Sequence, residues 1–260
     1  MLKPLQGKRI VITRSQEQAE ALSDRLTQLG ARPILCPTVQ FVPLLAEPLE
    51  KALRQLGRYD WLIFTSGNAV DYFFQRLAAI HDLGANGPEV WPRVAASGPA
   101  TAQKLREHQL EPAFIPDELI GERLAVGLGD LAGQRVLLPR AKIGRPELVD
   151  LLRQQGAIVD EIPLYDTIAA APDPQALAEL ARGFDAVTFT SPSTVRNFLQ
   201  ILEEAEALRS RLDRAVIACL GPVTAGQATA CGLTVHIIAA EYTADGLAQA
   251  LADYFQGRPT

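Results

Sequence analysis

Hydroxyl-bearing residues and glycines stand at four points where a short apolar run ends and a helical pattern begins. The sequence FTS occurs at 64–66 and 189–191, and GPxTA occurs at 98–102 and 221–225. A helix start presents free backbone N–H groups and the positive end of the helix dipole, and such groups bind carboxylates or phosphates. The motifs therefore indicate an anion-binding site. Its candidate residues are Thr65, Ser66, Gly98, Thr101, Thr190, Ser191, Gly221 and Thr224.

Helix capping is the simpler explanation for any one of these motifs, because Ser and Thr are favoured caps in any helix. The presence of each motif twice favours the anion-binding interpretation.

Basic and amide side chains add to the candidate site. Arg14 and Arg140 end two matching apolar runs, with Lys142 and Arg145 close behind the second. At the carboxyl edge of a sheet these cations would meet acidic groups of a ligand, although a strand-end arginine is also often simply exposed. Asn68 has no counterpart of the same type, and it either caps the following helix or reaches a ligand.

Tyr165 is the candidate catalytic residue, in the extended segment LYDT at 164–167. A tyrosine beside a binding site donates a proton or a hydrogen bond, but an aromatic residue in such a segment is equally often a packing residue. The sequence contains no Ser-His-Asp set, Walker loop or GxGxxG motif. Its three histidines lack the spacing of metal ligands, and we expect no metal and no cofactor.

Composition limits the class of protein. The chain has 260 residues, 48% of them hydrophobic, and a net charge of −5, which suits two domains and argues against a nucleic-acid partner. Three cysteines without close spacing indicate reduced thiols. The N-terminus lacks the pattern of a signal peptide, and the uncharged segment 215–240 is broken by glycine and proline. We therefore expect a cytoplasmic protein that does not bind membranes.

The chain repeats itself. GKRIVITR at 7–14 returns as GQRVLLPR at 133–140, and YDWLIFTSGNAVDYFFQRL at 59–77 returns as FDAVTFTSPSTVRNFLQIL at 184–202. Blocks that return in the same order indicate two copies of one α/β module. Two such lobes usually form a cleft, and we expect the ligand there.

Short apolar runs alternate with helical patterns in both copies, which predicts a doubly wound parallel sheet in each lobe. All strand-to-helix turns should then lie at one edge of each sheet. The predicted strands are 9–14, 32–37, 61–66, 94–99 and 112–116, and then 135–140, 157–163, 186–191, 216–222 and 234–239.

Two extended connectors, TVQFVPL at 38–44 and PLYDTIA at 163–169, occupy matching places in the copies. If they pair as a two-stranded hinge, the first lobe is discontinuous and holds 1–37 and 170–260. The second lobe then holds 44–163, with hinge connectors at 38–43 and 164–169. A tandem split near residue 130 is the alternative, and periodicity does not decide between the two.

The ordered set of motifs resembles the uroporphyrinogen-III synthase family. It comprises TR at 13–14, DWLIFTSxNAV at 60–70, GPxTA at 98–102 and 221–225, LLPR at 137–140, LYxT at 164–167 and FTSPS at 189–193. Gly67 and Ser97 depart from the family, which often has Ala at the first position and an apolar residue at the second. The resemblance implies two flavodoxin-like lobes joined by a two-stranded ladder.

The resemblance also implies an activity. The family cyclises hydroxymethylbilane, a linear tetrapyrrole with many carboxylates, to uroporphyrinogen III, with loss of water, inversion of the last ring and no cofactor. Tyr165 matches the family's tyrosine at this connector, which makes it the candidate proton donor. We expect a monomer that transiently contacts the preceding enzyme of the pathway. The competing hypothesis is a two-lobed ligand-binding or sensor module without turnover.

Overall fold

The computed structural model describes residues 3–45, 47–80, 90–117, 121–144, 146–203 and 206–257. The chain divides into two compact units, which we call unit 1 (residues 1–40 and 168–260) and unit 2 (residues 41–167). Unit 1 is therefore assembled from both ends of the chain, whereas a tandem split near residue 130 would place residues 9–12 and 61–64 in one sheet.

Unit 1 contains a five-stranded sheet whose paired strands all run parallel. In chain order the strands lie 2-1-3-4-5 across the sheet, the flavodoxin-like order. The spatial order is β10 (Ile237–Ile238), β9 (Val216–Cys219), β8 (Ala186–Phe189), β1 (Arg9–Ile12) and β2 (Arg32–Leu35).

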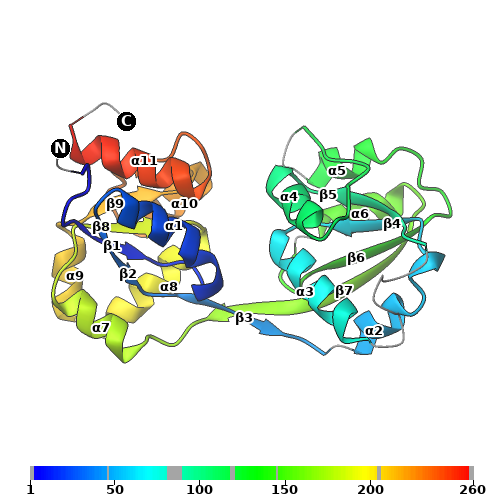
Figure 1. The fold of residues 1–260 in the computed structure, drawn as a ribbon, viewed down its shortest axis with the longest axis horizontal. Coiled ribbons are helices and arrows are strands. Elements are labelled where there is room, and N and C mark those ends of the chain that lie inside the picture. Colours follow the sequence, from blue (N-terminus) through cyan, green and yellow to red (C-terminus); the bar gives the residue numbers. More distant parts are fainter. Residues whose placement is uncertain are drawn as a thin grey trace. The chain divides into compact units, whose positions relative to one another are not determined.

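Helices cover both faces of this sheet, because the buried side chains of each strand alternate between two apolar cores. One core joins the sheet to α1 and α11, and the other joins it to α7, α8, α9 and α10 (Figure 1). The helix bounds are α1 (Gln16–Gln28), α7 (Pro174–Ala181), α8 (Pro192–Glu203), α9 (Glu206–Leu212), α10 (Pro222–Ala230) and α11 (Ala244–Phe255).

Unit 2 contains the second five-stranded sheet. Its central strands pair in parallel, whereas the hydrogen bonds from Leu44 N–H to Leu164 O (2.9 Å) and from Ala170 N–H to Thr38 O (3.1 Å) show that β3 runs antiparallel to β7. The spatial order is β3 (Val39–Pro43), β7 (Ile158–Ala169), β6 (Arg135–Ala141), β4 (Trp61–Phe64) and β5 (Arg93–Ala96).

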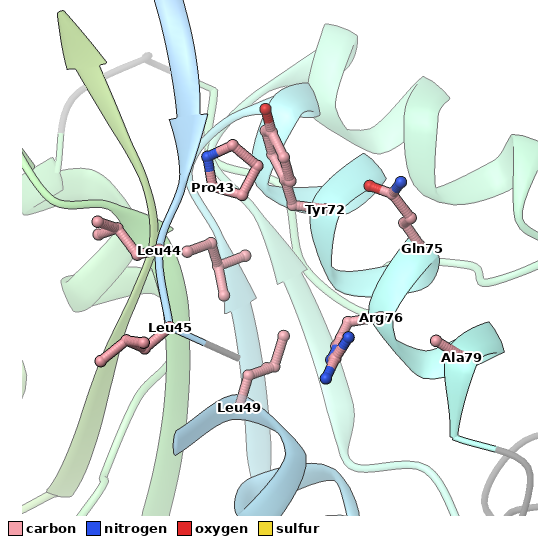
Figure 2. Close-up of a pocket in the computed structure, with 9 residues that line it drawn as sticks. Pro43, Leu44, Leu45, Leu49, Tyr72, Gln75, Arg76 and Ala79 are labelled. Atoms are coloured by element: carbon pink, nitrogen blue, oxygen red, sulfur yellow. The ribbon is translucent and has the colours of Figure 1, made fainter. Parts of the chain in front are cut away.

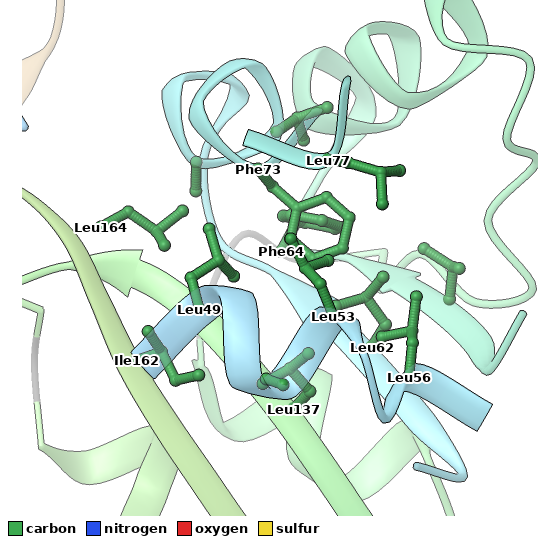
Figure 3. Close-up of a cluster of buried hydrophobic side chains, with 14 of the residues drawn as sticks. Leu49, Leu53, Leu56, Leu62, Phe64, Phe73, Leu77, Leu137, Ile162 and Leu164 are labelled. Atoms are coloured by element: carbon green, nitrogen blue, oxygen red, sulfur yellow. The ribbon is translucent and has the colours of Figure 1, made fainter. Parts of the chain in front are cut away.

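Two apolar cores flank this sheet as well. Phe64, Leu62 and Leu137 meet α2, α3 and α4 on one face, and Figure 3 shows Phe64 against Phe73 and Leu53 there. Trp61 and Leu138 meet α5 and α6 on the other face. The bounds are α2 (Glu47–Leu53), η1 (Leu56–Arg58), α3 (Gly67–Ala79), α4 (Pro99–Glu107), α5 (Gly121–Gly127) and α6 (Glu147–Gln154). Two doubly wound lobes, as predicted, are confirmed.

The predicted fifth strands are wrong in extent. The segment 112–116 makes only an isolated bridge between Ala95 and Phe114, and the strand expected at 234–239 is reduced to β10. Pro112 and Pro116 bracket the first segment, and proline cannot donate to a strand ladder. Short pairing at a sheet edge also limits the surface open to another strand.

Candidate active site

The carboxyl ends of parallel strands meet at one edge of each sheet, and ligands of this fold bind there, at the point where the strand order reverses. That point lies between β4 and β6 in unit 2 and between β1 and β8 in unit 1. The unit 2 edge carries Thr65, Ser66, Asn68, Gly98, Thr101 and Arg140. The unit 1 edge carries Arg14, Thr190, Ser191, Gly221 and Thr224. Each unit thus gathers its own share of the predicted residues.

A β-bulge turns Tyr165 toward helix α3. Arg140 of β6 lies opposite Pro163 of β7, but the next residue, Ala141, lies opposite Tyr165. The extra residue in β7 places Tyr165 on the same face as Ala141, and both pack in the core beneath α3. Without the bulge, strand alternation would point the phenol to the opposite face.

The hydroxyl of Tyr165 lies at the start of α3. It is 3.1 Å from Ser66 Oγ, and a second hydrogen bond joins it to the Asn68 side chain. Ser66 is also the N-cap of α3, since its Oγ accepts the Ala69 N–H at 3.2 Å. The structure therefore brings the predicted catalytic residue into contact with two predicted binding residues.

The phenol of Tyr165 is a neutral donor. The residue is only 3% exposed, and this burial raises its pKa, while the hydrogen bonds that join it to Ser66 and Asn68 act in the opposite direction. A tyrosine ordinarily titrates near pH 10. Tyr165 consequently keeps its proton at neutral pH and can donate it.

Two aromatic rings hold the ring of Tyr165. Tyr72 of α3 stacks on it with centroids 5.0 Å apart, and Phe41 of β3 meets it edge-on at 5.4 Å. Sequence reasoning missed both residues. Nothing in the sequence marks them, because the three rings come from segments that only the fold brings together.

Capping is part of what the serines do. Ser191 and Thr194 form a reciprocal cap at the start of α8, with the Ser191 N–H donating to Thr194 Oγ1 and the Thr194 N–H donating to Ser191 Oγ. Thr101 and Thr224 are buried, at 6% and 4% exposed, and the Thr101 hydroxyl lies 3.5 Å from that of the partly exposed Ser97. Each of these two helix starts also leaves backbone N–H groups of its first turn without a partner in the helix.

The arginines differ in their surroundings. Burial lowers the pKa of Arg14, whose Nη2 donates to Gln18 at 3.2 Å, although a guanidinium stays charged in proteins. Arg140 is 5% exposed and its Nη2 and Nε lie 2.5 and 2.7 Å from Glu161 Oε1. Lys142 pairs with Asp166 at 2.7 Å. Arg145 lies outside the described residues.

Neither a metal site nor a membrane span is found in the described residues. Within those ranges, no three His, Cys, Asp or Glu residues gather where they could hold a metal ion. No helix in the described part of the chain is long and apolar enough to cross a membrane.

Known proteins resemble this chain over nearly its whole length. Residues 20–249 match the family described as uroporphyrinogen-III synthase HemD. The uroporphyrinogen-III synthase of Synechococcus elongatus is 34% identical, over 97% of both chains. A porphyrin biosynthesis protein HemD of Ruminiclostridium josui is 30% identical over 97% of this chain, which spans 50% of that longer protein.

Solved structures show the same fold. A crystal structure of a mutant uroporphyrinogen III synthase from Thermus thermophilus superimposes with a TM-score of 0.64 and 23% sequence identity, covering 97% of this chain and 100% of the other. A ligand-binding or sensor module without turnover is not favoured, because the family and its named relatives are enzymes. The chain belongs to the uroporphyrinogen-III synthase family, the cyclising lyases of tetrapyrrole biosynthesis.

Proposed function

We propose that this enzyme cyclises hydroxymethylbilane to uroporphyrinogen III with Tyr165 as the group that assists loss of the substrate's hydroxyl. The observation that supports this role is the protonated phenol of Tyr165 at the carboxyl edge of unit 2, hydrogen-bonded to Ser66 and Asn68. Both partners are partly exposed at the start of α3.

The first step needs a proton donor. The C–O bond of the hydroxymethyl group breaks with its electron pair on oxygen, and a proton from Tyr165 lets that oxygen leave as water. The substituted carbon of the last ring attacks the remaining azafulvene-type cation and becomes a spiro centre. The bond from that carbon to the methylene of the preceding ring then breaks, and the methylene bonds to the free α-carbon of the last ring. A proton leaves this α-carbon for the Tyr165 phenolate, so the ring is inverted and the phenol is restored. Substrate released early would close unaided to the uninverted isomer, so the enzyme's main task is to hold the chain in the inverting geometry.

Backbone N–H groups are the main ligands for the substrate's carboxylates in this proposal. Helices α4 and α10 begin at Pro99 and Pro222, directly after Gly98 and Gly221, and each presents free N–H groups in its first turn. The hydroxyls of Thr65, Thr190 and Ser191 and the guanidinium of Arg14 add further donors. Local donors of this kind allow a protein with a net charge of −5 to bind a polyanion.

We place the reaction in the cytoplasm, in keeping with three free cysteines. The enzyme acts there as a monomer that takes its labile substrate by transient contact with the preceding enzyme.

Tyr165→Phe tests the catalytic assignment. The variant keeps the ring, so we expect the fold to persist and turnover to fall by about 10²-fold, the low end of general acid catalysis, because water can partly replace the phenol. The product should remain the inverted isomer. Tyr254→Phe, which removes a phenol from α11 in unit 1, is the control and should retain full turnover. Unchanged turnover in Tyr165→Phe, with substrate saturating and chemistry limiting, would remove Tyr165 from the mechanism.

A further inference from the structure

We infer that Tyr72 is a positioning residue that fixes the phenol of Tyr165 for proton donation. This inference rests on the proposed role of Tyr165. Tyr72 would act through the ring of Tyr165, without itself touching the reacting atoms.

The contacts of Tyr165 come largely from one helix. Helix α3 supplies Ser66 and Asn68 for the hydroxyl, and one turn further along it supplies the Tyr72 ring, which stacks at a centroid distance of 5.0 Å and an interplanar angle of 24°. Because these groups share a rigid element, the direction of the hydroxyl and the plane of the ring are set together. A hydrogen bond to a hydroxyl weakens steeply when its angle is lost, so a tilted ring would also lose Ser66.

Tyr72 has a cavity beside it. The cavity has a volume of about 320 Å³. Figure 2 shows Tyr72 and Arg76 projecting from α3, with Leu44, Leu45 and Leu49 around the hollow. Arg76 is ion-paired with Glu50. Tyr72 lines the cavity and also stacks on the ring of Tyr165, so its ring lies between the two. Removal of its ring would therefore enlarge an existing space next to Tyr165.

Tyr72→Leu should allow the ring of Tyr165 to move. Small misplacements of a catalytic group cost up to about 10²-fold in rate. We expect Tyr72→Leu to lower kcat by about 10-fold with little change in KM. The loss of kcat should not exceed the loss in Tyr165→Phe. Tyr72→Phe keeps the stacked ring and should restore most of kcat. Phe74→Leu is the matched control, because Phe74 lies on the same helix and stacks on His108 and Trp91 instead.

Two readouts separate positioning from general damage to the fold. In a Tyr165→Phe background, Tyr72→Leu should add no further loss of kcat, because the group it positions is already gone. The alkaline ultraviolet titration of Tyr165, obtained as the difference from Tyr165→Phe, should shift to lower pH in Tyr72→Leu, since water then reaches a phenol whose pKa burial had raised.

The outcomes are distinct. An equal loss of kcat in both backgrounds, or an equal loss in Phe74→Leu, would overturn the positioning role. So would an unchanged kcat in Tyr72→Leu when Tyr165→Phe is slow. An unchanged kcat in Tyr165→Phe would instead overturn the proposed function of Tyr165 and leave Tyr72 with nothing to position.

Discussion

The ion pair between Arg140 and Glu161 allows a quantitative test of how the edge of the unit 2 sheet is built. Arg140 is on β6 and Glu161 on the neighbouring β7, and the Arg140 side chain is 6% exposed while that of Glu161 is 34% exposed. Glu161→Gln keeps the shape of the side chain and one acceptor oxygen but removes the charge. The guanidinium then stays in a shielded site without the charge of Glu161 beside it.

The expected cost lies between two limits. Breaking a fully buried ion pair costs about 3–5 kcal/mol, and an exposed pair contributes about 0.2–1 kcal/mol. Because one partner is buried and the other is one-third exposed, we expect Glu161→Gln to lower the free energy of unfolding by about 2 kcal/mol. At about 2–4 °C per kcal/mol for a chain of this size, Tm should fall by about 4–8 °C.

Urea denaturation followed by circular dichroism, with calorimetry for Tm, measures this loss. Glu111→Gln is the control, since Glu111 pairs with Arg106 at 2.9 Å on the exposed surface and its loss should leave stability unchanged. KM should not change in Glu161→Gln if Arg140 serves to hold β6 and β7 together. A change in stability no larger than that of the control, or a lower KM because Arg140 is released to bind substrate, would refute this reasoning.

Two further predictions concern titration and reactivity. Burial raises the pKa of Cys36 to about 12, with the nearby charge of Asp173 adding to the effect, and burial raises that of Cys219 to about 11. At pH 8 a thiol reagent should therefore react quickly with only the partly exposed Cys231 in the native protein. After unfolding it should react with all three cysteines. Fast reaction of two or more thiols in the native protein would contradict the buried positions of Cys36 and Cys219. Burial, with the hydrogen bond to Asp160, raises the pKa of Tyr59 to about 12, so the folded state binds this proton more tightly than the unfolded chain, whose tyrosines titrate near pH 10. The stability that the Tyr59 phenol contributes should be complete below about pH 10 and lost as the pH rises toward 12. Urea denaturation across this range should show a shallower decline in the free energy of unfolding in Tyr59→Phe than in the parent.

Much of the fold follows from the sequence because buried parallel strands are short, mainly apolar runs without polar alternation. RIVI, WLIF and AVTF are such runs, and each is a central strand of its sheet. The edge strands were harder to predict. PAFIP has the apolar content of a strand but a proline at each end. Its pairing also depends on which backbone hydrogen-bonding groups the neighbouring strand leaves available.

The candidate site was predictable in its parts but not in its contacts. The turn after WLIF and the connector that holds Tyr165 were separate motifs, and their meeting depends on one extra residue in β7. Pro163 beside the bulge is a weak signal, since prolines within sheets occur at edges or bulges, but it does not tell which of the two applies. The partner of Arg140 could not be predicted either. A cation at a strand end pairs with a ligand or with a residue of the next strand, and the choice depends on the strand register, which the sequence does not reveal.

The most direct test of the central claim is the product made from freshly generated hydroxymethylbilane. The substrate is incubated with the purified chain, the products are oxidised to porphyrins, and the isomers are separated by chromatography. The account predicts uroporphyrin III as the main isomer, formed in proportion to enzyme, against uroporphyrin I in the control without enzyme. Uroporphyrin I as the main product at every enzyme concentration would contradict the assignment of this chain as a cyclising enzyme.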